Sequence, residues 1–457
     1  SDLLLRVRDD EWKAIKDACK GLLGDALDLQ VLQRAWRQAR QGHAAETHPP
    51  RTHAPDETQD GTGDVVWPQG LLITAKGFPT ENAGNLGLIF AHHPLWSEHL
   101  WFDSVRGLPM LGNDELTDEG IVDIAVRLGT DFRLPVKSLR LVERLLHAQC
   151  HKQTRDPIQE WLAALPPWDG TPRLTVWLPL LGGVNDAEAP LGAFVSQLWP
   201  VSMIARAMRP GELYRTVIIL EGAEGLGKSA LVRTLGAPWY VDFSLRLESK
   251  EAHMMLRGAW LAEFTEIESL SRSDELRING FITQTADQYI PKYLNTRVDI
   301  PRRTVFVGTT NQRVYLKGQT GNTRFFPVRL STALDFAYVA KIRDQLFAEA
   351  LQWWADHRDT WWQVPSALEA VLTQGREQRR VASEYEGPLG AWLADKASTN
   401  FEEIAQFFLG INKRDWTRAL QMEIGGALRA LGWESVVRRV QGRVARAWQP
   451  QQPSAST

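Results

Sequence analysis

Apolar positions recur at helical spacing over much of the first half of the chain. Leu, Trp and Ala recur at helical spacing among Lys, Arg and Asp over residues 1–42, which predicts a helical N-terminal segment. The segment 65–210 shows similar spacing, and its last predicted helix, Ala193–Met208, ends at Pro210-Gly211. Between these regions, residues 43–64 are rich in His, Pro, Thr, Asp and Gly and cannot bury a core. We therefore predict a flexible linker at 43–64 and a mainly helical domain at 65–210.

The pattern changes at residue 211, where short apolar runs begin to alternate with helical segments. The run Thr216–Leu220 is β-branched and apolar, as in a buried strand, and Ser229–Leu235 is helix-prone. Strands that alternate with helices indicate an α/β fold with a parallel sheet. Helical, Trp-rich sequence continues to residue 384, so we assign 211–384 to one domain.

The C-terminal segment 385–450 has its own pattern. Two amphipathic helices are predicted over Phe401–Leu409 and Thr417–Leu431, and a hairpin is predicted over Trp433–Trp448 with its turn at Gln441-Gly442. Helices followed by a hairpin are typical of a winged-helix domain. The residues that follow, 451–457, read as a disordered tail.

Composition narrows the class of protein. The 457 residues leave room for two or three domains, and the net charge of −3 excludes a chain that is basic throughout. Any nucleic-acid surface must therefore be a local patch. Two cysteines, Cys19 and Cys150, cannot form a disulfide framework, and no signal peptide or apolar run long enough for a membrane span is present, so we expect a cytoplasmic protein. The chain begins at Ser1 rather than Met, as a piece of a longer protein would.

A glycine-rich loop separates the predicted strand Thr216–Leu220 from the helix after it. Strand, glycine loop and helix form the arrangement of a P-loop, in which backbone N–H groups surround phosphate oxygens. Lys228 would reach the β- and γ-phosphates, and the Ser229 hydroxyl would ligate Mg²⁺. The sequence thus predicts that ATP and Mg²⁺ bind at Gly222, Glu224, Gly225, Gly227, Lys228, Ser229 and Ala230.

A P-loop needs a carboxylate on a neighbouring strand to hold the metal and prepare a water molecule. The run Ala259–Glu266 is apolar and ends in two carboxylates. Glu263 would hold the metal through water or polarise the attacking water, and Glu266 is the alternate or second carboxylate. The division of roles between them stays open, as does a reading of the run as the acidic start of a solvated helix.

Two further polar residues follow in order. Asn311 ends the next predicted strand and would orient the lytic water. Arg324 lies on a Gly/Asn turn, where an arginine could reach a nucleotide bound by a neighbouring subunit and stabilise the transferring phosphoryl group. The competing candidates for this arginine finger are Arg302, Arg303 and Arg329.

The order of these motifs resembles AAA-type ring ATPases and, more narrowly, the virulence-associated E family of phage and mobile-element proteins, which is similar to superfamily 3 helicases. The resemblance covers residues 65–335 and rests on Trp168–Arg173, Pro210-Gly211, Glu221–Ser229, Glu263–Glu266, Val307–Asn311 and Gly321–Pro327. It implies an AAA-type P-loop core. The chain departs from the family pattern at Thr323, where the family has an arginine, and at Tyr289–Tyr293, where an arginine is usual. These departures affect which basic residue is the finger, not whether ATP binds.

Two hairpins are candidate DNA contacts. The resemblance implies that Lys292 or Arg297, in a predicted hairpin ahead of the Asn311 strand, grips the DNA backbone in the channel of a ring; an inter-subunit or nucleotide-facing hairpin is the alternative. In the C-terminal hairpin, a basic face would contact phosphates, or would be the solvated face of a protein-docking domain. Its arginines are Arg438, Arg439, Arg443 and Arg446.

The resulting functional hypothesis is an ATP-dependent DNA helicase or translocase that acts in replication of a phage or mobile element. The resemblance implies a ring of six subunits around single-stranded or forked DNA. The alternative is a non-translocating AAA-type ATPase that loads or remodels a replication partner. A small-molecule phosphotransferase is not favoured, because no acceptor-binding signature is evident. A primase domain would have to lie upstream of Ser1, because residues 1–64 are too short for one.

Overall fold

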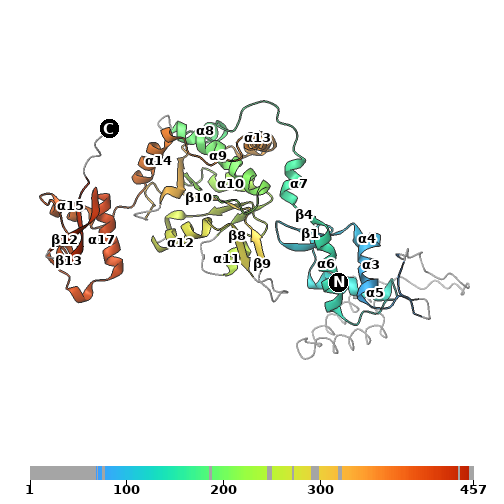
Figure 1. Cartoon of the computed structure of the whole chain (residues 1–457). Helices are drawn as coiled ribbons and strands as arrows, with labels where there is room; N and C mark the ends of the chain where they lie inside the picture. Colours follow the sequence, from blue (N-terminus) through green and yellow to red (C-terminus); the bar gives the residue numbers. More distant parts are fainter. Residues whose placement is uncertain are drawn as a thin grey trace, which may run out of the picture. The chain divides into compact units, whose positions relative to one another are not determined.

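The computed structural model describes residues 68, 70–74, 78–184, 188–243, 250–269, 272–289, 298–317, 322–440 and 443–451 (Figure 1). The predicted N-terminal helix 1–42, the linker 43–64, the tail beyond Gln451, and both Lys292 and Arg297 lie outside these ranges and remain predictions. The contacts divide the chain into two compact units. The first holds residues up to Phe102 and Leu108–Thr154, and the second holds Asp103–Gly107 and everything from Arg155.

The first unit combines helices with a small sheet. Its helices bury one apolar face each in a shared core that includes Leu86, Phe90, Leu128 and Leu146. The helices are α3 (Ala83–His92), α4 (Pro94–Ser97), α5 (Asp118–Thr130) and α6 (Leu139–Lys152). The sheet has the order β3-β2-β1-β4, formed by β1 (Leu100–Asp103), β2 (Leu108–Leu111), β3 (Asp114–Glu115) and β4 (Thr154–Arg155). The sequence did not predict these strands, because two to four residues are too few to display an alternating pattern.

The second unit is built on a parallel sheet, as the sequence predicted. Five strands have the order β11-β5-β10-β7-β6, and every neighbouring pair is parallel. The strands are β5 (Val217–Glu221), β6 (Tyr240–Asp242), β7 (Leu261–Phe264), β10 (Val305–Thr310) and β11 (Phe325–Arg329). All residues of β5 and β10 are buried, which explains the apolar runs Val217–Leu220 and Val305–Val307.

Helices cover both faces of this sheet (Figure 1). Ile218 and Leu220 of β5 point into a core shared with one group of helices, and Val217 and Ile219 point into a second core on the other face. The first group includes α9 (Ala189–Met208), α10 (Lys228–Gly236), α13 (Phe336–Asp356) and α14 (Ser366–Gln378). The second includes α11 (Lys250–Met255) and α12 (Arg272–Ile282). The remaining elements are α7 (Pro157–Ala163), α8 (Trp177–Gly182) and a hairpin of β8 (Ala286–Tyr289) and β9 (Val298–Pro301).

The C-terminal segment has the predicted order of helices and hairpin. It contains α15 (Glu386–Leu393), α16 (Phe401–Glu403), a π-helical turn at Ile404–Phe408 and α17 (Arg418–Ala430), followed by the antiparallel strands β12 (Trp433–Val440) and β13 (Arg443–Pro450). Leu389, Ile424, Leu428 and Trp448 form its core. Thr399 pairs with Trp448 as an isolated antiparallel bridge and adds a third short stretch to the hairpin. The winged-helix assignment stays a prediction.

No helix in the part of the chain that the structure describes is both long enough and apolar enough to cross a membrane.

Candidate nucleotide-binding site

The residues that the sequence predicts to bind a nucleotide lie together at one edge of the parallel sheet. β10 lies between β5 and β7, with Thr310 beside Glu221 and Gly308 beside Phe264. Parallel strands present their carboxyl ends at the same edge, which is where ligands bind in open α/β sheets. The glycine loop after β5, the carboxylates after β7 and the asparagine after β10 are therefore brought together.

The glycine loop leads directly into the N-terminus of α10. Gly227 is the residue before the helix and has φ 88°, a left-handed conformation that favours glycine, and no side chain caps this helix end. At Gly222, a Cβ atom would lie 2.6 Å from Leu226 Cδ1 and 2.8 Å from the Leu330 carbonyl oxygen. Only glycine fits there. The first N–H groups of α10 are thus free of a side-chain acceptor, as an anion site requires.

Lys228 spans the loop. Its Nζ donates to the carbonyl oxygens of Gly222 and Ala223, both at 2.9 Å, and to Asn311 Oδ1 at 2.8 Å. Burial lowers the pKa of the Lys228 ammonium, and nearby carboxylates, Glu268 first among them, oppose that shift. The contact with Asn311 joins two predicted site residues from different elements.

Glu263 is a fully buried carboxylate held by three hydroxyl groups. Its Oε1 accepts from Ser229 Oγ at 2.6 Å and from Thr309 Oγ1 at 2.8 Å, and its Oε2 accepts from Tyr240 OH at 2.7 Å. Burial and the hydrogen bond to Glu263 raise the pKa of Tyr240 well above its ordinary value, so the phenol stays a neutral donor. Ser229 and Glu263 supply hard oxygen ligands of the kind that Mg²⁺ prefers, so this pair fits the predicted metal.

A pocket of about 380 Å³ opens in front of these residues. Its lining residues come from the glycine loop, from the segment after β7 and from the end of β10. They are Glu224, Gly225, Gly227, Lys228, Ser229, Ala230, Thr265, Glu266, Glu268, Thr309, Thr310 and Asn311. Glu263 lies behind this surface and reaches the pocket through Ser229.

Two carboxylates after β7, Glu266 and Glu268, face the pocket, and the sequence predicts a role for Glu266 alone. Glu266 is exposed and has φ 51°, a conformation that is uncommon for a residue with a side chain. Glu268 has a buried Oε2 with no hydrogen-bond partner among the described residues. A carboxylate oxygen without a partner is costly unless a ligand or water satisfies it. The sequence also gave no signal for Tyr240 and Thr309, whose roles depend on their contact with Glu263.

The candidate arginines lie in different settings. Arg324 closes a short 3-10 helix, Asn322–Arg324, ahead of β11 and has no hydrogen bond or ion pair among the residues described. Arg302 is buried against Asp287, with Nε 3.0 Å from Oδ2. Arg303 contacts Asp156 at 2.7 Å. Arg302 and Arg303 are thus paired within their own chain, whereas Arg324 has no such pair among the residues described.

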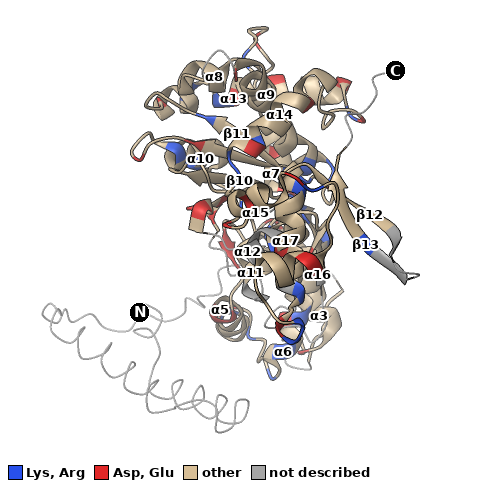
Figure 2. Cartoon of the chain, turned by 90° about the vertical axis from the view of Figure 1, so that its left-hand side faces the viewer, with Lys and Arg blue, Asp and Glu red and all other residues tan. Residues whose placement is uncertain are grey.

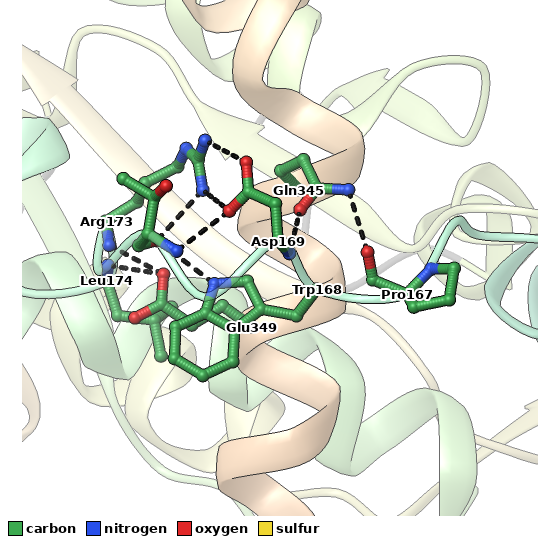
Figure 3. A network of polar contacts seen from close by, with 8 residues as sticks. Pro167, Trp168, Asp169, Arg173, Leu174, Gln345 and Glu349 are labelled. Carbon is green, nitrogen blue, oxygen red and sulfur yellow. Dashed lines mark hydrogen bonds and ion pairs between the residues drawn. The ribbon is translucent and has the colours of Figure 1, made fainter.

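No residue of the motif Trp168–Arg173 lines the pocket, and the motif docks on Gln345 and Glu349 of α13 (Figure 3). Asp169 and Arg173 form an ion pair at 2.7 Å, and this pair holds the pKa of Asp169 well below its ordinary value. The backbone N–H of Asp169 donates to Gln345 Oε1 at 2.7 Å, and that of Arg173 donates to Glu349 Oε2 at 2.7 Å. The motif thus fixes the chain that leads into α8 against the helix beside α10.

The C-terminal hairpin pairs β12 with β13, and the four predicted arginines fall on these two strands. Figure 2 shows the two strands projecting as a ribbon. Arg446 is exposed and lies opposite Val437, which is 70% exposed. The strand register places Arg438 opposite Ala445, Arg439 opposite Val444, and Arg443 opposite Val440. The side chains of Arg438, Arg439 and Arg443 lie outside what the structure describes, so their contact with DNA remains a prediction.

Comparison with known proteins places the pocket within a recognised domain. The apo structure of the NrS-1 C-terminal region (305–718) is similar at 14% identity, covering 77% of this chain and 96% of that chain, with a TM-score of 0.44. A second apo structure of that region, the A form, has 13% identity, the same coverage of both chains and a TM-score of 0.39. No curated protein matches. Residues 162–381, which contain every pocket-lining residue, match the family model of the virulence-associated protein E-like domain.

Proposed function

We propose that the chain is an ATP-dependent DNA helicase or translocase that acts in replication of a phage or mobile genetic element. The observation that carries the ATPase part is one connected cluster. Lys228 and Ser229, at the start of α10, contact Asn311, which directly follows β10, and Glu263, which lies in the neighbouring strand β7. The DNA-motor part comes from the resemblance to superfamily 3 helicases and from the match to the virulence-associated protein E-like domain.

Triphosphate binding would use the loop and the start of α10. The N–H groups of Gly225, Gly227 and the first helical turn would surround the phosphate oxygens. Lys228 would exchange its carbonyl partners, Gly222 and Ala223, for the β- and γ-phosphates. Mg²⁺ would offset the negative charge of those phosphates. Ser229 would ligate it directly, and Glu263 would hold it through a water molecule.

Water activation falls to the carboxylates that face the pocket. Three hydroxyl donors occupy the oxygens of Glu263, so this carboxylate is poorly placed to accept a proton from water. Glu266 is exposed at the pocket and carries no such constraint. We therefore assign Glu263 to the metal and Glu266 to the water, with Asn311 as the residue that orients that water.

A further positive charge, which stabilises the transferring phosphoryl group, would come from a neighbouring subunit. In a ring, Arg324 of one subunit would reach the γ-phosphate in the pocket of the next, where it stabilises the charge that develops during transfer. Its lack of a partner among the described residues supports this assignment, because an arginine already paired within its own subunit would have to give up an ion pair first.

A test with three measurements separates the parts of the proposal. The purified chain is assayed for ATP hydrolysis with Mg²⁺, for stimulation of hydrolysis by single-stranded DNA, and for unwinding of a forked duplex, with Lys228→Ala as the inactive control. We expect hydrolysis, strong stimulation and unwinding. Hydrolysis without stimulation or unwinding would refute the motor and favour an ATPase that loads or remodels a partner. Absence of hydrolysis in the wild-type chain under all conditions would refute the whole proposal.

A further inference from the structure

Arg376 of α14 holds the chain on both sides of Arg324. Its Nη2 donates to the carbonyl oxygen of Thr323 at 2.7 Å, and its Nε donates to that of Phe325 at 2.9 Å. The guanidinium carbon lies 5.1 Å from the centre of the Phe326 ring. Arg376 is half-buried, and burial lowers its pKa, although an arginine remains charged at any ordinary pH.

This contact restrains Arg324 directly. The donors of a guanidinium group have a fixed planar geometry, so two hydrogen bonds from one group fix two acceptors relative to each other. Here the two acceptors are the carbonyl groups immediately before and after Arg324. These two hydrogen bonds therefore restrain the backbone on both sides of Arg324.

The helix that carries Arg376 is itself anchored beside the glycine loop. One turn further along, at the end of α14, Arg379 forms a buried two-point ion pair with Glu221, with Nη2 2.8 Å from Oε2. Tyr315 OH donates to the same carboxylate at 2.6 Å. Glu221 is the last residue of β5 and directly precedes Gly222. Arg376 therefore projects from a helix whose position is fixed against the base of the phosphate loop.

We propose that Arg376 is a positioning residue for Arg324: it holds the turn on which this arginine is presented to the nucleotide of a neighbouring subunit. The inference rests on the proposed role of Arg324. A purely structural alternative exists, because β11 is an edge strand and the Arg376–Phe325 bond also covers an edge carbonyl. The two readings differ in what they predict for catalysis.

The test is a double-mutant cycle in the full chain. Steady-state ATPase activity and the affinity for a fluorescent ATP analogue are measured for Arg324→Ala, Arg376→Ala, the double variant and Arg376→Lys. Gln378→Ala, an exposed residue on the same helix, is the matched control. If Arg376→Ala does not fold, Arg376→Lys takes its place in the cycle, because lysine can satisfy one carbonyl but not both.

Positioning predicts a specific pattern. Arg324→Ala should lower kcat by about 1000-fold, as removal of an arginine finger does. Arg376→Ala should lower kcat about 10- to 100-fold, since small misplacements of catalytic groups have effects of that size, with nucleotide affinity changed by less than about twofold. Arg376→Lys should recover part of this loss. The double variant should be no slower than Arg324→Ala alone, because an absent side chain gains nothing from being positioned.

Other outcomes would overturn the inference. If the fold-losses in kcat of the two single variants multiply in the double variant, or if nucleotide affinity falls in parallel with kcat, Arg376 acts through stability and not through Arg324. If kcat falls in Arg324→Ala but stays at the wild-type value in Arg376→Ala, the positioning role is overturned and the proposed function stands. A fully active Arg324→Ala would instead remove Arg324 from the proposed mechanism, and the positioning role with it.

Discussion

The Ser229 hydroxyl lies 2.6 Å from Glu263 Oε1, so the end of the phosphate loop and the buried carboxylate of β7 are directly hydrogen-bonded. The same Glu263 oxygen accepts from Thr309 of β10, which lies next to β7 in the sheet. Three elements thus meet at one carboxylate. These hydrogen bonds fix the orientation of the carboxylate, which would lower the free-energy cost of organising the proposed Mg²⁺ site on binding.

Replacing the two carboxylates one at a time should separate their roles. Glu263→Gln removes the charge beside Ser229, so we expect hydrolysis to fall at least about 100-fold and the Mg²⁺ concentration needed for activity to rise. Glu266→Gln should lower kcat by a similar factor with an unchanged Mg²⁺ requirement, because it removes only the base. Titrations of ATPase rate against Mg²⁺ measure both. A raised Mg²⁺ requirement in Glu266→Gln, with none in Glu263→Gln, would reverse the assignment.

Tyr240→Phe should destabilise the protein although it removes a single oxygen atom. The variant leaves Glu263 Oε2 buried without its donor, and an unsatisfied buried acceptor costs about 1–3 kcal/mol. We expect a fall of that size in the free energy of unfolding, measured by urea denaturation. Tyr338→Phe, at an exposed tyrosine, is the control and should change stability by less than about 0.5 kcal/mol. Equal stability of both variants would contradict this account of Glu263.

Loss of Arg379 should lower the free energy of unfolding more than Tyr240→Phe does. Glu221 is 2% exposed, and its carboxylate depends on Arg379 and Tyr315. Arg379→Met keeps much of the side-chain volume but leaves a buried charge unpaired, which typically costs about 3–5 kcal/mol. We expect a loss of this size in urea denaturation. Arg144→Met, at an exposed arginine, is the matched control.

The grouping of residues at the candidate site could be predicted because its signals are local. A β-branched run, a glycine loop and a helix follow one another, and each reflects a backbone requirement that the residues nearby reveal. The structure accordingly places Lys228, Ser229, Glu266 and Asn311 around one pocket. Parallel pairing of β5, β7 and β10 followed from the alternation of strands with helices.

Contacts between distant residues could not be predicted in the same way. Tyr240 and Thr309 matter only because the sheet places them beside Glu263, and their own neighbours in sequence carry no sign of it. Charge alone likewise did not separate Arg302, buried in an ion pair, from Arg324, which has none among the described residues. Both distinctions depend on burial, which only the tertiary structure determines.

Acidification should weaken the first unit through His93. Its Nδ1 accepts from the backbone N–H of Leu95 at 3.3 Å, and burial, aided by Arg127, lowers its pKa below the ordinary 6.5. The unfolded chain then binds a proton more readily than the folded one, so stability is complete above about pH 6.5 and falls as the pH drops toward the lowered pKa. Melting temperatures between pH 7.5 and 5.5 should show this fall.

A His93→Asn variant keeps a side-chain acceptor at this helix start and cannot titrate, so its melting temperature should depend less on pH. Some dependence should remain, because burial also lowers the pKa of His147. His99→Asn, at an exposed histidine, is the control and should retain the wild-type pH profile. A His93→Asn profile identical to that of the wild type would exclude His93 as the source.

The C-terminal hairpin offers a test of DNA contact that is independent of ATP chemistry. If Arg446 contacts a phosphate, Arg446→Ala should weaken binding of single-stranded DNA and reduce the slope of log affinity against log salt by about 0.7, the change for one phosphate contact on a single strand. Replacing Arg438, Arg439, Arg443 and Arg446 together should reduce the slope by about four times as much.

ATP hydrolysis without DNA should stay at the wild-type rate in both variants, because these residues do not line the pocket. An unchanged salt slope with reduced affinity would indicate that the hairpin supports the domain and does not contact phosphates, and Arg144→Ala, at an exposed arginine elsewhere, controls for the general loss of positive charge.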